Sequence, residues 1–73
     1  MVGKTIFDKD YKDLVTKISK ARVEAGFTQK HLAKKLGKTQ SYISKIESAQ
    51  IRIDVLQLRQ IAKVLGKDIS YFL

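Results

Sequence analysis

Glycines and capping residues divide this chain into short segments with a helical pattern. The apolar residues recur at spacings of three and four, and no segment shows the sustained alternation that is typical of a strand. Gly26, Gly37 and Gly66 each follow one of these segments, where glycine can take the left-handed conformation that ends a helix. The pattern therefore predicts an all-α fold of short helices joined by tight turns.

The capping residues extend this prediction to five helices. The first would begin near Asp8 or Asp10, because either carboxylate can accept hydrogen bonds from free amides, and would end at Gly26. The residues that would cap the other four segments are Thr28, Thr39, Asp54 and Asp68. The last segment is a short turn over residues 69–73. The apolar residues expected to face the core are Tyr11, Leu14, Val15, Ile18, Ala21, Ala25, Leu32, Ala33, Leu36, Ile43, Ile46, Val55, Leu58, Ile61, Ala62 and Leu65.

The length of 73 residues leaves room for one domain, 1–73, with residues 1–9 as a candidate flexible N-terminal arm. The chain has no cysteine, which excludes a disulfide scaffold, a cysteine-ligated zinc site and a thiol nucleophile. Its single histidine, His31, cannot form a histidine-rich metal cluster. We therefore expect no enzyme activity, no metal and no cofactor. The polar start and the lack of a long apolar run predict no membrane association and a cytoplasmic location.

Positive charge is concentrated in the middle of the chain. There are 15 Lys and Arg against 7 Asp and Glu, a formal net charge of +8. Residues 28–53 hold six of the basic residues and one acid, Glu47. Such an excess suits a polyanion such as nucleic acid, which we expect to meet this part of the chain.

The same region carries the pattern that says most about function. Two short helices separated by a three-residue turn containing Gly37 must cross at a steep angle, as in a helix-turn-helix. Ile43 and Ile46 would face inward on the second of these helices. The residues left outside are Gln40, Ser41, Tyr42, Ser44, Lys45 and Ser48. None is acidic, and such hydrogen-bonding side chains suit base edges and phosphates.

On these residues the chain resembles the Xre/Cro family of helix-turn-helix proteins. The matching residues are Thr28, Gln29, Leu32, Ala33, Leu36, Gly37, Thr39, Gln40, Ser41, Ile43, Ser44, Ile46 and Glu47, followed by Leu58, Ala62, Leu65, Gly66 and 69–73. The resemblance covers about residues 11–73. It implies a compact five-helix, repressor-like domain with the helix-turn-helix in helices two and three, and a transcriptional regulator that binds double-stranded DNA sequence-specifically.

The resemblance also implies a role for individual residues. The helix at about 40–48 would read the major groove, with base contacts from Gln40, Ser41, Ser44 and Lys45. The DNA backbone would be contacted by Gln29, Lys38, Thr39, Tyr42 and Arg52. Family members often join two positions below this helix by a salt bridge, and those positions are Arg22 and Glu47 here.

Two residues depart from the family pattern. The family usually has glycine after the third helix and often proline before the fourth, whereas this chain has Ala49 and Ile53. We therefore expect the loop over 48–53 to take an unusual path.

The resemblance implies a homodimer on a palindromic operator. The end of the chain allows two interpretations. Ile69, Phe72 and Leu73 complete the core, or the terminal Tyr71, Phe72 and Leu73 form a self-association surface with Ile6 and Phe7. Two alternatives remain: an antitoxin-type protein that also binds a protein partner, and an adaptor that uses the same fold for protein binding alone. The polar outward set argues against the adaptor, because protein interfaces favour aromatic or apolar anchors.

Overall fold

The computed structural model describes the backbone of residues 2–73 and the side chains of residues 9–73. Its elements are α1 (Val2–Glu24), α2 (Gln29–Leu36), α3 (Gln40–Glu47), α4 (Val55–Leu65) and the 3-10 helix η1 (Ile69–Tyr71). The all-α prediction is confirmed. The expected fifth helix is instead one 3-10 turn, because the amides of residues 71–73 bond to carbonyls three residues back.

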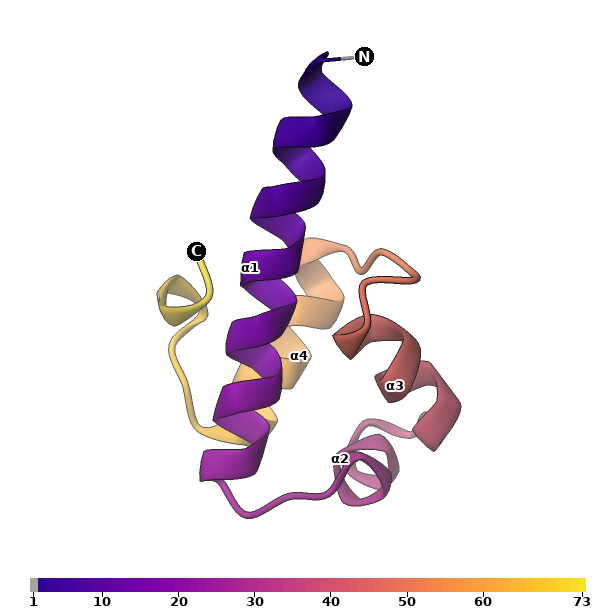
Figure 1. Ribbon diagram of the computed structural model, residues 1–73. Coiled ribbons are helices and arrows are strands. Elements are labelled where there is room, and N and C mark those ends of the chain that lie inside the picture. Colours follow the sequence, from indigo (N-terminus) through magenta and orange to yellow (C-terminus); the bar gives the residue numbers. More distant parts are fainter. Residues whose placement is uncertain (1) are drawn as a thin grey trace.

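The five elements surround one core (Figure 1). α1 runs the length of the molecule, with α2 and α3 on one side and η1 with the C-terminus on the other. α2 packs most closely on α3, and both α1 and α2 also contact α4. The N-terminal part of α1 extends beyond the other elements. No helix among the described residues has a stretch long and apolar enough to cross a membrane.

Buried apolar side chains from all five elements or their ends form the core. Its members are Val15, Ile18, Ala21, Leu32, Ala33, Ile43, Ile46, Leu58, Ile61, Ala62, Leu65 and Phe72. Phe72 therefore completes the core, as one of the two interpretations proposed, whereas Leu73 is 80% exposed and does not. Two predicted core residues are exposed. Val55 is the first residue of α4, and Ala25 lies beyond the last residue of α1, so neither is covered by a neighbouring element.

The start of the first helix was predicted wrongly. α1 begins at Val2, so Asp8 and Asp10 lie inside the helix and do not cap it. Residues 2–9, where we expected a flexible arm, have helical backbone. Neither aspartate lies in the first turn of α1, which holds no acidic residue. An aspartate inside a helix costs less than about 1 kcal/mol relative to alanine, and the sequence pattern does not separate this position from a cap. The side chains of Ile6 and Phe7 lie outside the described residues.

The other helix starts are confirmed. The side chains that cap α2, α3, α4 and η1 are Thr28, Thr39, Asp54 and Asp68. In α3, for example, the Thr39 hydroxyl oxygen accepts a hydrogen bond of 3.1 Å from the amide of Tyr42. Because each cap contacts an amide only two or three residues ahead, the short-range pattern fixes these starts.

All four α-helices end in the same type of turn. One residue just past each helix has a positive φ, and the amide that follows it donates to the carbonyl five residues back. The positive-φ residues are Gly26, Gly37, Ala49 and Gly66. Ala49 has a φ of 63°, so the chain keeps the turn although it lacks the glycine that the resemblance led us to expect.

Candidate nucleic-acid interface

α3 has one buried face and one exposed polar face. Ile43 and Ile46 are each 1% exposed and hold the helix against the core. The opposite face carries four exposed side chains: Gln40, Ser41, Ser44 and Lys45. These are the residues predicted to contact bases, and the structure brings them together on one accessible surface.

Lys38, Thr39 and Tyr42 border this face at the start of α3. The Lys38 ammonium lies 5.2 Å from the centre of the Tyr42 ring, a cation–π distance. Thr39 is exposed and its hydroxyl oxygen caps α3, while Tyr42 is half-buried. The three residues predicted to contact the DNA backbone here therefore lie beside the exposed face, with two of them in mutual contact.

An ion pair anchors the C-terminal end of α3 to α1. The Arg22 guanidinium donates to both carboxylate oxygens of Glu47, with Nε–Oε2 at 2.7 Å and Nη2–Oε1 at 3.2 Å. Arg22 Nη1 also donates to the Phe27 carbonyl oxygen at 2.7 Å, in the turn before α2. The side chains are only 12% and 7% exposed. The predicted pair is thus present, and it joins α1, the α1–α2 turn and α3.

Gln29 also contacts this ion pair. Its side-chain nitrogen donates to Glu47 Oε1 at 3.1 Å, which links the first turn of α2 to the last turn of α3. We expected Gln29 at a phosphate, and that role stays a prediction. The contact with Glu47 was missed because the two residues are 18 positions apart.

Tyr11 fixes the loop between α3 and α4. Its hydroxyl donates to the Ile51 carbonyl oxygen at 2.8 Å, and the Arg52 guanidinium lies 4.6 Å from the centre of its ring. Burial raises the pKa of the Tyr11 phenol above its ordinary value. We had taken Tyr11 as a core residue alone. Its apolar spacing on α1 gave no signal of a contact 40 residues away.

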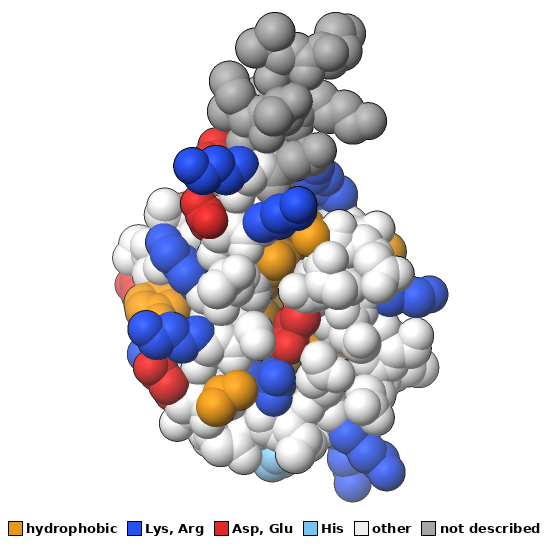
Figure 2. Space-filling model, in the orientation of Figure 1, with side chains coloured by type: hydrophobic (Ala, Val, Ile, Leu, Met, Phe, Trp, Pro, Cys, Tyr) orange, Lys and Arg blue, Asp and Glu red, His pale blue; other side chains and the backbone are white. Residues whose placement is uncertain are grey.

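The surface of the helix-turn-helix is strongly basic. Glu47 is the only acid in residues 28–53, and Arg22 already pairs with it. The exposed cations of this segment are Lys30, Lys34, Lys35, Lys38, Lys45 and Arg52. On the face drawn in Figure 2, basic side chains and no acidic ones lie over α2. The electrostatic field around α2 and α3 therefore attracts anions.

Comparison with known proteins agrees with this geometry. Residues 18–72 match the model of a helix-turn-helix family. The solved structure of an XRE-family like protein from Pseudomonas syringae pv. tomato str. DC3000 is similar, with a TM-score of 0.89 and 38% sequence identity. The similarity covers 97% of this chain and 87% of that one. No curated protein matches the chain.

Proposed function

The chain belongs to the XRE-type helix-turn-helix family, and from this membership we propose that it is a repressor-like transcriptional regulator that binds double-stranded DNA sequence-specifically. The observation that carries this proposal is the outward face of α3. Its exposed side chains are uncharged donors and acceptors plus one lysine, without an acid to repel phosphate. An α-helix of this width fits the major groove.

Each exposed residue of α3 has a different capacity to read bases. The Gln40 amide can donate to and accept from one adenine, which discriminates well against other bases. Lys45 can donate to the edge of a guanine. Ser41 and Ser44 offer one hydroxyl each and therefore read less specifically.

Contacts to phosphates would hold α3 in register. The side chains proposed for this role are Gln29, Lys38, Thr39, Tyr42 and Arg52. The free amides and positive dipole end of α2 add to the attraction, because Gln29 is the first residue of that helix.

We further propose that the protein acts as a homodimer on a palindromic operator in a prokaryotic cytoplasm. One short reading helix contacts few bases, so two copies on half-sites about 34 Å apart would supply the missing specificity. Neither a metal nor a cofactor takes part in this scheme, and no catalytic step is proposed.

The decisive experiment selects bound duplexes from a random DNA library at near-physiological salt. We expect wild type to enrich an inverted repeat, and Gln40→Ala to lose or relax one position of each half-site. Gln60→Ala is the matched control, since Gln60 is an exposed glutamine on α4. Failure of the folded wild-type protein to enrich any sequence would contradict the proposal and favour an adaptor that binds only protein.

A further inference from the structure

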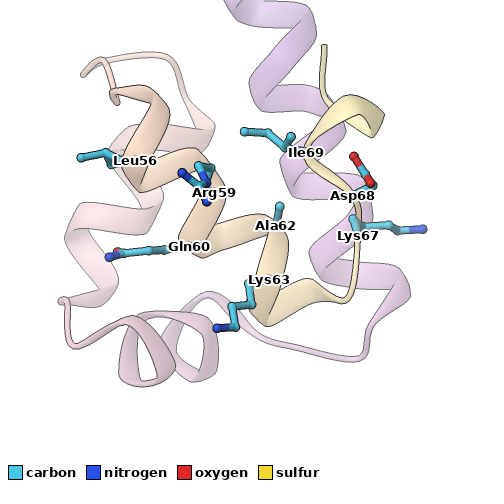
Figure 3. Close-up of a pocket in the computed structure, with 8 residues that line it drawn as sticks. All are labelled: Leu56, Arg59, Gln60, Ala62, Lys63, Lys67, Asp68 and Ile69. Atoms are coloured by element: carbon cyan, nitrogen blue, oxygen red, sulfur yellow. The ribbon is translucent and has the colours of Figure 1, made fainter.

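A hollow of about 590 Å³ lies between α4 and η1 (Figure 3). Its apolar lining consists of Leu56, Ala62 and Ile69, and its basic lining of Arg59, Lys63 and Lys67. We refer to these six residues as the α4–η1 groove. In the close-up α4 and η1 form the groove, while α2 and α3 lie to the side of it.

The apolar part of the groove is open to solvent. Leu56 is 62% exposed at the start of α4, next to Val55 at 60%. Ile69 is half-buried on the η1 side. Covering such an exposed leucine with another apolar side chain is favourable, because it removes apolar surface from water.

The charged side chains that line the hollow are mostly positive. Arg59 and Lys63 lie one helical turn apart on α4, a helix that has no acidic residue. Lys67 is held in place, with its ammonium 4.6 Å from the centre of the Tyr71 ring and 4.0 Å from a Glu24 carboxylate oxygen. Against these three cations the lining contains one acid, Asp68.

We propose that the α4–η1 groove binds an acidic, amphipathic segment of a partner protein. An apolar side chain of the segment would enter the hollow between Leu56 and Ile69, and its carboxylates would pair with Arg59 and Lys63. Opposite charge at the rim would steer the segment and select against neutral sequences. This inference does not depend on the DNA-binding proposal, because it uses none of the residues assigned to DNA.

Two other occupants fit the groove less well. If two copies met symmetrically at this groove, Arg59 and Lys63 of both would face one another and repel. A DNA backbone would satisfy the cations but would leave Leu56 and Ile69 without an apolar partner. An acidic segment with an apolar residue satisfies both parts of the lining.

The test is selection of peptides from a random phage-displayed library on the wild-type protein, without DNA. We expect enrichment of peptides that combine Asp or Glu with Leu, Ile or Phe. The affinity of an enriched peptide is then measured by fluorescence anisotropy. Arg59→Glu and Lys63→Glu should each weaken binding by about tenfold or more, because reversal converts attraction into repulsion.

The matched control is Lys20→Glu, the same charge reversal at an exposed lysine of α1 outside the groove. It should leave peptide affinity within about twofold of wild type. The proposal is overturned by a lack of enrichment, by enriched peptides without acidic residues, or by equal losses in all three variants. A concentration-dependent dimer that Lys63→Glu dissociates would instead assign the groove to a second copy. A loss of DNA affinity in Lys63→Glu but not in Lys20→Glu would assign the groove to DNA.

Discussion

Ala49 adopts a left-handed conformation that ordinarily favours glycine. In this conformation a residue with a Cβ atom lowers the stability of the fold by about 1–2 kcal/mol. Replacement by glycine removes that strain. Glycine also makes the unfolded chain more flexible, which lowers stability by about 0.4–1 kcal/mol and opposes the gain. The half-buried methyl group of Ala49 packs against the core, so its loss further reduces the stability gained by the replacement.

We therefore expect Ala49→Gly to raise the free energy of unfolding by about 0.5 kcal/mol, measured by urea denaturation. The reciprocal variant, Gly26→Ala, should lower it by about 1 kcal/mol. Gly26 has a φ of 79° and open space where a Cβ would lie, so its backbone conformation alone decides the result. A clear loss of stability in Ala49→Gly would mean that the methyl contact outweighs the strain.

The Arg22–Glu47 pair makes a second prediction at the scale of single residues. Removing one partner of a buried pair typically lowers stability by about 3–5 kcal/mol, and the slight exposure of this pair places it near the lower end. Glu47→Gln leaves the Arg22 charge without its carboxylate, so the melting temperature should fall sharply. Circular dichroism measures this directly.

The control for Glu47→Gln is Glu24→Gln. Glu24 is 51% exposed and lies 4.0 Å from the Lys67 ammonium, so its loss should change stability by less than about 1 kcal/mol. Equal melting temperatures for the two variants would show that the buried pair contributes no more than a surface pair.

At the scale of elements, the sequence predicts the parts of the fold that depend on neighbouring residues. Thr28, Thr39 and Asp54 were correct as caps because each contacts an amide three residues ahead. The start of α1 was wrong because an aspartate is tolerated inside a helix as well as favoured at a cap, and Asp8 and Asp10 lie beyond the first turn of α1. Contacts between distant residues, such as Gln29 with Glu47, leave no mark in a local pattern.

The loop between α3 and α4 depends on such a distant contact. Tyr11 on α1 donates to the Ile51 carbonyl oxygen, and Tyr11→Phe removes this bond but keeps the ring beneath Arg52. We expect the variant to be about 1 kcal/mol less stable near neutral pH, where the phenol carries its proton. Urea denaturation measures the difference, and hydrogen exchange should show faster exchange in residues 49–53.

The same contact predicts a pH dependence. Burial raises the pKa of Tyr11 in the folded protein. The contribution of Tyr11 to the free energy of unfolding is therefore complete below the ordinary tyrosine pKa and is lost as pH rises through the raised pKa. Tyrosinate has no proton to donate to Ile51. The stability difference between wild type and Tyr11→Phe should therefore shrink with increasing alkalinity. A difference that stays constant across this range would contradict the assignment of the stabilisation to the hydrogen bond.

For the molecule as a whole, the placement of charge is more informative than its sum. Some basic residues lie around the exposed face of α3, others on the α4–η1 groove and others along α1. Positive charge anywhere on the surface raises the affinity for a polyanion. A cation that contacts a phosphate in the complex also displaces the counterions bound to that phosphate. Salt dependence can therefore separate cations that touch DNA from cations that only add to the field.

We expect the logarithm of the DNA association constant to fall linearly with the logarithm of salt concentration. Lys38→Ala should weaken binding similarly across operator variants and reduce the magnitude of this slope by about 1, since it removes one phosphate contact. Gln40→Ala should keep the slope and change sequence preference, because it removes a base contact. Lys20→Ala, on the exposed side of α1, should change neither. If Lys20→Ala reduced the slope as much as Lys38→Ala, net charge and not the face of α3 would account for binding.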